Sequence, residues 1–215
     1  IKESRSELLK FYEDFQSSPR DSSFLHKNFK VKVKKGWDIL EGYDNIAGET
    51  DLSKYIKEIS YRPFDNRFIF YEEKLVWRTV KRVMRNFLEK ENVALMICRQ
   101  TAIDNWEHIS ITNKIADDSR VSNRTKERGY ILPLYIYPES VEENTQEELI
   151  ESNNQNEIVR TPNLDPEIVA DIAKATGLTF TAEKSNEAGT FAPIDILDYI
   201  YAVLHSPTYR ETYKE

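Results

Sequence analysis

The sequence has little of what metal and cofactor sites require. It contains one cysteine, Cys98, and three histidines, His26, His108 and His205, among 215 residues. A lone cysteine cannot form an internal disulfide, and the histidines lack metal-ligand spacing, so we expect a reducing cytoplasm and no metal or cofactor in this chain. Only six glycines are present, and no Walker, dinucleotide-binding, Gly-x-Ser-x-Gly, Cys-x-x-Cys or His-Glu-x-x-His motif occurs.

Two further absences exclude other classes of protein. No run of 18 apolar residues and no charged-then-apolar leader is present, so we expect no membrane partner. No Pro-Pro pair is present, although the amino-methyltransferases that flip a base need an Asn/Asp-Pro-Pro-Tyr/Phe turn, so the chain cannot methylate DNA by itself. The chain begins at Ile1 within a helical pattern, which favours an excised part of a longer polypeptide.

The charges are unevenly distributed along the chain. The net charge is −7, but residues 138–159 hold seven glutamates and no base, so the remainder carries 30 basic and 30 acidic residues. Residues 26–37 hold five lysines and no acid, and residues 61–100 hold nine bases against five acids. Local positive charge, rather than the charge of the whole chain, decides whether a surface can bind phosphates, although solvated lysines and an ordinary polar helix face give the same pattern.

The periodicity of apolar residues predicts an α+β fold. We expect a mixed or mostly antiparallel sheet with a packed helix and a helical C-terminal portion. Strands are predicted at 29–33, 56–61, 67–71, 93–98, 106–112 and 130–137, helices at 2–16, 79–90, 166–176 and 193–205, and a loop with a turn of helix near Leu52 at 36–53. The expected divisions are a lead-in helix and linker at 1–28, an α/β recognition core at 29–137, an acidic flexible loop at 138–160, and a helical portion of the same domain at 161–215. We expect the acidic loop to point away from DNA or toward another protein surface.

Polar and basic side chains follow the predicted buried strand and fill the stretch 119–125. Arginine pairs with guanine, and asparagine or glutamine with adenine, at the edges of base pairs. The base-reading candidates are Arg99, Gln100, Ser122, Asn123 and Arg124. The phosphate-contacting candidates are Lys32, Lys34, Lys35, Arg78, Arg82 and Arg85. Each of them, taken alone, is equally typical of an exposed loop residue.

Two other functions are open at this point. Asp65, Glu72 and Lys74 form the short acid-then-Glu-x-Lys pattern of a magnesium-dependent nuclease, which is common by chance. The predicted helix at 193–205 is apolar around nearly its whole circumference, which indicates either complete burial or a docking surface for another protein.

Four blocks of sequence, in order, resemble the C-terminal specificity region of type ISP restriction-modification enzymes. They are Tyr61–Arg67 with Tyr71, Ala94–Gln100, Gly129–Tyr135 and Tyr199–Arg210. The resemblance spans about 59–213 and implies a non-catalytic domain that recognises a duplex DNA target for an upstream adenine-N6 methyltransferase in the same polypeptide. It also implies that S-adenosylmethionine, ATP and magnesium act elsewhere in that polypeptide, and it leaves open whether the polypeptide cleaves, translocates or only methylates.

Overall fold

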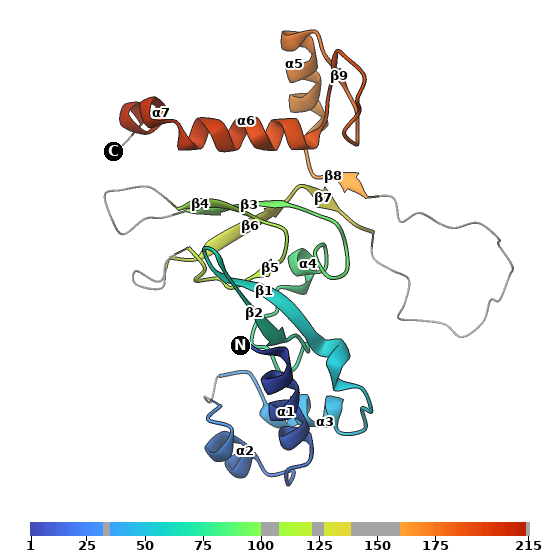
Figure 1. Ribbon diagram of the computed structural model, residues 1–215, viewed down its shortest axis with the longest axis vertical. Coiled ribbons are helices and arrows are strands. Elements are labelled where there is room, and N and C mark those ends of the chain that lie inside the picture. Colours follow the sequence, from blue (N-terminus) through green and yellow to red (C-terminus); the bar gives the residue numbers. More distant parts are fainter. Residues whose placement is uncertain (32–34, 100–107, 122–126, 139–159, 214–215) are drawn as a thin grey trace, which may run out of the picture.

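The computed structural model describes residues 1–31, 35–99, 108–121, 127–138 and 160–213, and it confirms the α+β class. Three parts follow one another along the long axis of the molecule (Figure 1). N-terminal helices form one end, two small sheets form the middle, and the helices that follow residue 160 form the other end.

The N-terminal part is a cluster of short helices around its own apolar core. It consists of α1 (Arg5–Gln16), α2 (Ser22–Asn28), α3 (Ile39–Ile46) and the 3-10 helix η1 (Leu52–Tyr55). A serine or aspartate caps each of them, and the side-chain oxygen accepts a hydrogen bond from a backbone N–H of the first turn. The buried residues that form the core are Leu8, Phe15, Leu25, Ile39, Ile46, Leu52, Ile56 and Phe70.

The first sheet has the order β2-β1-β5. Strands β1 (Ile56–Arg62) and β2 (Asp65–Phe70) form an antiparallel hairpin, as predicted, and β5 (Ile115–Ala116) adds to β1 in parallel. The hairpin turn contains only Pro63 and Phe64, because Arg62 pairs with Asp65. This short turn makes the end of the hairpin narrow.

The second sheet has the order β4-β3-β6 and is antiparallel throughout. Its strands are β3 (Ala94–Cys98), β4 (Ile109–Thr112) and β6 (Gly129–Pro133), which confirms the buried central strand and its two predicted neighbours. Residues Ile59, Phe87, Ala94 and Ile115 form a shared core that joins this sheet to the first. The short helix α4 (Lys81–Met84) contacts β6.

The part after residue 160 covers the outer face of the second sheet. Helix α6 (Pro193–His205) packs there, with Leu197 against Leu95 and Ile109 in one buried cluster. The remaining elements are α5 (Pro166–Thr176), α7 (Pro207–Thr212) and two short strand pairs, namely β7 (Tyr135–Ile136) with β8 (Thr161–Pro162) and β9 (Thr179–Phe180) with β10 (Thr190–Phe191). The predicted helices at 166–176 and 193–205 are confirmed at both ends.

Three predictions of local structure were wrong. Residues 29–31 do not form a strand, because α2 ends there, Lys30 takes a positive φ of 52° and Phe29 packs on the N-terminal core. The predicted loop at 36–53 contains α3, which Asp38 caps. The helix predicted at 79–90 is reduced to α4, because Val80 has a φ of 48° and the Asn86 side chain donates to the carbonyl oxygen of Val83 at 3.0 Å.

None of the described helices is long and apolar enough to cross a membrane. Residues 139–159, which hold most of the acidic segment, lie outside the described residues. The proposed division of the chain at 1–28, 29–137, 138–160 and 161–215 stays a prediction.

Candidate nucleic-acid interface

One edge of the two sheets brings together three segments that are far apart in the sequence. The Arg62 guanidinium donates to Asp117 Oδ1 at 2.9 Å, and the backbone N–H of Gly129 donates to the carbonyl oxygen of Asp118 at 2.7 Å. Gly129 in turn pairs with Cys98, at the end of β3. The β1–β2 turn, the end of β3 and the start of β6 therefore share one edge. We call this surface, formed by Tyr61, Arg62, Pro63, Phe64, Asp65, Arg67, Arg99, Asp117 and Tyr130, the hairpin edge.

Guanidinium groups lie over aromatic rings at two places on the hairpin edge. Arg99 is exposed, and its guanidinium carbon lies 4.8 Å from the centroid of the Tyr130 ring, which is itself 42% exposed. Arg62 and Arg67 lie over the Tyr61 ring, with guanidinium carbons 3.9 and 4.5 Å from its centroid. A guanidinium stacked on a ring is held in place while its N–H groups stay available in the plane for a ligand.

A buried arginine, Arg120, ties the two sheets together behind this edge. Its side chain is 7% exposed, and it donates from Nε to the Ser60 hydroxyl in β1 at 2.6 Å and from Nη1 to the Ser110 hydroxyl in β4. Burial lowers the pKa of Arg120, because charge is costly away from water. Arg120 belongs to the polar stretch 119–125 that was expected to face DNA, and its burial corrects that expectation for this residue.

A buried pair of side chains, His108 and Glu127, joins the starts of two strands. His108 Nε2 lies 3.1 Å from Glu127 Oε2, and both side chains are less than a tenth exposed. His108 precedes β4 and Glu127 precedes β6, so the contact fixes the positions from which these strands begin. The pair and Arg120 together link the strands that support the hairpin edge.

Cys98 ends β3 directly beside the exposed Arg99 and is buried. Burial, and secondly the negative charge of Glu127, raise the pKa of its thiol. The thiol therefore stays protonated and unreactive at neutral pH, which is typical of a packed rather than a catalytic cysteine.

Of the five base-reading candidates, the structure describes only Arg99, which lies on the hairpin edge. Gln100, Ser122, Asn123 and Arg124 lie outside the described residues. The described residues that flank them, Arg99 and Glu127, lie at the end of β3 and just before β6.

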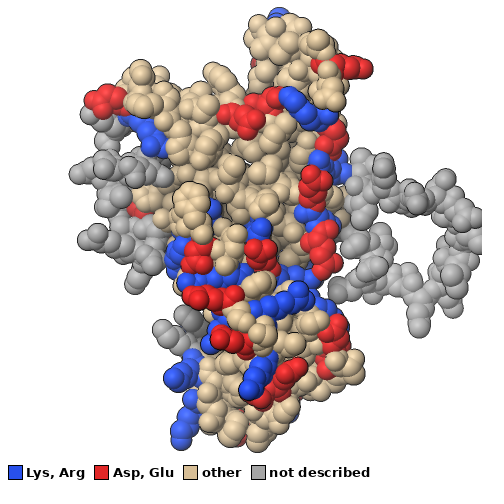
Figure 2. All heavy atoms as spheres, viewed as in Figure 1, with Lys and Arg blue, Asp and Glu red and all other residues tan. Residues whose placement is uncertain are grey.

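Of the phosphate-contacting candidates, the structure describes four, and these come from two separate stretches of the chain. Lys32 and Lys34 lie outside the described residues, and Lys35 is exposed near the N-terminal helices. Arg78 is exposed, with its guanidinium carbon 4.4 Å from the Trp77 ring centroid, Arg82 is exposed on α4, and Arg85 is half-buried after it. In the view of Figure 2, charges of both signs lie over the middle and the N-terminal end of the molecule, and others lie around α6.

The residues of the nuclease pattern serve separate structural contacts. Asp65 accepts from Arg67 Nε at 3.0 Å, and buried Glu72 accepts from the backbone N–H groups of Lys74 and Leu75 at 2.9 and 2.8 Å. The Lys74 ammonium pairs with Glu41 at 3.1 Å. In the described ranges, no three His, Cys, Asp or Glu side chains are placed to hold a metal ion. The structure thus offers no support for the nuclease alternative.

Two features of the hairpin edge went unnoticed in the sequence. The sequence did not show that Arg62 and Arg67 stack on Tyr61, and a structural role for them, as braces of the turn through Asp65, was as well supported there as a binding role. Arg67 does bond Asp65, but Arg62 bonds Asp117 instead. Only a recognised hairpin register could have shown that Tyr61 and Arg67 lie near each other.

Comparison with known proteins gives the chain a family and a fold. The family model described as the type ISP C-terminal specificity domain matches residues 1–215. The fold resembles part of a cryo-EM structure of a DrdV–DNA complex, with a TM-score of 0.57 and 18% identity over 99% of this chain and 18% of that one. It also resembles part of the ATP-dependent type ISP restriction-modification enzyme LlaBIII bound to DNA, with a TM-score of 0.60 and 14% identity over 97% of this chain and 12% of that one. No curated protein sequence matches.

Proposed function

Because the chain belongs to the type ISP C-terminal specificity domain family, we propose that it recognises a duplex DNA target sequence on behalf of a larger restriction-modification polypeptide. The observation that carries this proposal is the hairpin edge, where exposed Arg99 is held on Tyr130 at the end of a buried strand. A rigid scaffold that presents guanidinium groups at its edge is what direct reading of base pairs requires.

The proposed contacts divide into two kinds. Arg99, with Gln100, Ser122, Asn123 and Arg124, reads base edges, where Arg99 suits guanine and the amides suit adenine. Exposed basic residues fix the register of the protein on the DNA backbone through phosphates. The proposed phosphate contacts are Lys32, Lys34, Lys35, Arg78, Arg82 and Arg85.

We assign the catalytic steps, methylation and the ATP- and magnesium-dependent reactions, to other parts of the polypeptide. The chain spans only 18% and 12% of the two solved chains that it resembles. We therefore place an adenine-N6 methyltransferase, which uses S-adenosylmethionine, upstream of this domain, and we place the ATP- and magnesium-dependent steps outside it. On this proposal the domain is non-catalytic and acts in the cytoplasm.

The test is to select bound sequences from a pool of random duplexes with the full polypeptide, and then to measure affinity for the selected duplex at several salt concentrations. We expect salt-dependent binding that is stronger for the selected duplex than for a scrambled one. Arg99→Ala should weaken selected-duplex binding by about tenfold, since one bidentate base contact supplies on the order of 1–3 kcal/mol of discrimination.

The matched control is Arg20→Ala, because Arg20 is also exposed but pairs with Asp44 at 2.6 Å in the N-terminal cluster. This variant should bind like the parent. Equal affinity for selected and scrambled duplexes would contradict the proposal.

A protein-docking role for α6 has one observation in its favour. Leu197 is buried against the second sheet, but Tyr199 is 72% exposed and Ile200 is 37% exposed. The helix thus has one face for its own sheet and a second apolar face that is free in the described structure.

If docking were the whole function, Tyr199→Asp would abolish a protein contact and the chain would show no salt-dependent DNA binding. If α6 contacts the upstream methyltransferase, the same change would separate the domains without altering the preferred sequence.

A further inference from the structure

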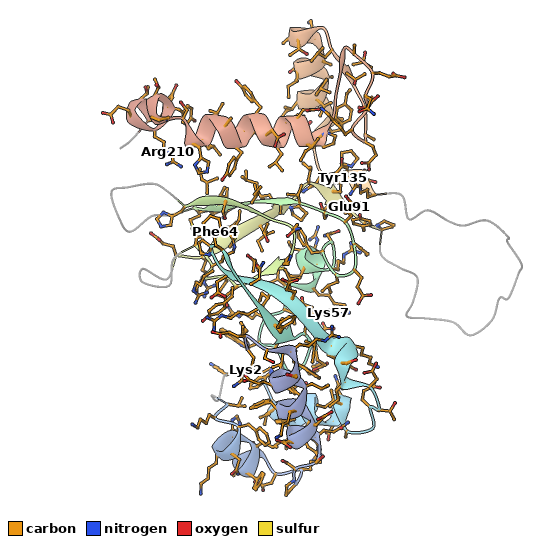
Figure 3. All side chains as sticks on the ribbon, viewed as in Figure 1. Lys2, Lys57, Phe64, Glu91, Tyr135 and Arg210 are labelled. Atoms are coloured by element: carbon orange, nitrogen blue, oxygen red, sulfur yellow. The ribbon has the colours of Figure 1, made fainter. Side chains whose placement is uncertain are left out.

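Phe64, at the turn of the β1–β2 hairpin, is the most exposed large apolar side chain in the described structure. Its exposure is 106%, whereas the next most exposed phenylalanine among the described residues, Phe24, is 38% exposed. Figure 3 shows Phe64 at the outer end of the hairpin. A ring this exposed contributes almost no packing to the described part of the fold, although a fully buried phenylalanine side chain would contribute on the order of 1.5–3 kcal/mol.

The backbone at Phe64 is strained as well. Its φ is +62°, and it follows Pro63 in a two-residue turn between the paired residues Arg62 and Asp65. Proline followed by a residue of positive φ is the pattern of a type II turn, in which the second place favours glycine. The fold would accept glycine there more readily than phenylalanine. Both the exposure and the strain therefore point to a contact outside the chain.

The turn that carries Phe64 is braced on both sides. Asp65 accepts from Arg67 Nε at 3.0 Å, and Arg62 donates to Asp117 at 2.9 Å. Both guanidiniums also stack on the Tyr61 ring. A ring on such a narrow, fixed tip can enter a gap only a few ångströms wide without first being ordered.

The surroundings of the ring favour nucleic acid as the ligand. Arg62 pairs with Asp117, and Arg67 pairs with both Asp65 and Glu3, so each of these carboxylates near the base of the turn faces a guanidinium. Arg99 and Tyr130 lie on the same edge. Proteins that kink duplex DNA insert an apolar side chain such as phenylalanine between two base pairs.

We propose that Phe64 is a wedge that inserts between adjacent base pairs of the bound duplex and partly unstacks them. The inference rests on the proposed function and deepens it, because it names a residue that deforms DNA rather than one that reads base edges. Unstacking near the target would lower the cost of extruding a base for the upstream methyltransferase.

The test uses the full polypeptide and the selected duplex, with 2-aminopurine at successive positions of the site. The unmodified protein should raise the 2-aminopurine fluorescence at one step, because unstacking relieves its quenching. Phe64→Ala should abolish this rise and weaken binding by about tenfold, since stacking of one base on an aromatic ring is worth on the order of 1–3 kcal/mol. Phe64→Trp should retain both signals.

Two further variants separate the wedge from a structural role. Phe64→Gly relieves the positive φ, so it should raise the melting temperature of the protein while it loses the fluorescence rise. Phe24→Ala removes the other exposed phenylalanine, in α2 of the N-terminal cluster, and should leave both DNA signals unchanged.

The possible outcomes distinguish the two proposals. Failure of the unmodified polypeptide to prefer any duplex overturns the proposed function and the wedge with it. Normal preference and fluorescence in Phe64→Ala overturns the wedge alone. Weaker binding of Phe64→Ala with an unchanged fluorescence rise also overturns the wedge, because it shows contact without insertion. A lower melting temperature in Phe64→Gly, or the same loss of binding in Phe24→Ala, overturns it as well.

Discussion

The interior between the two sheets and the hairpin edge use the same kinds of side chain in opposite ways. Buried Arg120 directs its N–H groups to the hydroxyls of Ser60 and Ser110, whereas exposed Arg99 lies over the Tyr130 ring. Among the described residues, the hydrogen-bond partners of Arg120 are hydroxyls, a carbonyl oxygen and a sulfur, and none is a carboxylate. The comparison teaches that an arginine in a polar stretch of sequence can join two sheets rather than bind a ligand. The burial of its side chain distinguishes the two roles.

Buried amides extend the same contrast. Asn92 donates from Nδ2 to the carbonyl oxygen of Tyr135 at 2.8 Å, and its Oδ1 accepts from the backbone N–H of Tyr135 at 3.1 Å and of Val93 at 2.9 Å. These bonds join the start of β3 to β7. Both ends of the Asn92 amide are thus used inside the protein, whereas the exposed guanidinium of Arg99 lies over a ring at the edge.

The largest effect on stability is expected from Arg120→Ala. The change leaves a cavity and deprives two buried hydroxyls of their donor, so the free energy of unfolding should fall by about 3 kcal/mol. Urea denaturation measures it. Arg120→Lys keeps the charge but loses the planar guanidinium, so its free energy of unfolding should lie between those of the parent and of Arg120→Ala. If Arg120→Ala and Arg99→Ala lower stability equally, the contrast between interior and edge is wrong.

Asn92→Ala should have the next largest effect. It leaves the backbone N–H and carbonyl of Tyr135 without their side-chain partner, which should cost about 2 kcal/mol of unfolding free energy. The exposed Asn113 provides the control, because Asn113→Ala should change stability by less than about 0.5 kcal/mol. If Asn92→Ala lowered the free energy of unfolding no more than Asn113→Ala does, the buried amide would not contribute to stability.

Asp195, half-buried at the start of α6, should have an intermediate effect that depends on pH. Its carboxylate accepts from Lys184 at 2.5 Å and from the backbone N–H of Ala192 at 2.9 Å, and these bonds lower its pKa from the ordinary value of 3.8. Asp195→Ala should lower stability by about 0.5–1 kcal/mol at neutral pH, as loss of a helix cap does.

The sign of the pH dependence follows from the lowered pKa. The folded state holds the Asp195 proton less tightly than the unfolded state, so the stabilisation is fully present above pH 3.8 and is lost as the pH falls through the lower folded pKa. Melting curves of the parent and of Asp195→Ala should therefore converge in acid. A difference that stays constant down to the lowest pH would assign the effect to packing instead.

The smallest effect on stability is expected at the edge itself. Arg99→Ala should change the free energy of unfolding by less than about 0.5 kcal/mol, because the side chain is exposed. The same variant should lose DNA affinity, so that stability and binding separate at this residue. If Arg99→Ala lost both stability and DNA affinity, Arg99 would have a structural role like that of Arg120.

The sequence predicted best those elements whose ends carry their own signals. Asp165, Pro166 and Gly177 mark the two ends of α5, and Pro193 marks the start of α6, so these three bounds followed from capping chemistry. The strands of the second sheet followed from apolar runs. In contrast, Phe29 and Val31 alternate with lysine as in a strand, but tertiary packing against α1 and α3 decides their conformation.

The candidate site was predictable in outline. The abrupt end of a buried strand at Arg99 placed that residue at an edge, and the structure agrees. Nothing local in the stretch 119–125 distinguishes Arg120, because its partners lie in β1 and β4, 60 and 10 residues away. Phe64 followed from no periodicity, since an apolar residue inside a turn belongs to neither a helix nor a strand pattern.

Cys98 gives this edge a reporter of its own. The only thiol in the chain lies where β3 meets β6, and burial keeps its pKa raised and its sulfur shielded. Modification by a thiol reagent must therefore wait for these two strands to part, so the labelling rate measures how often the edge opens. A bound duplex that clamps the edge should slow the labelling, and no engineered probe is needed to follow it.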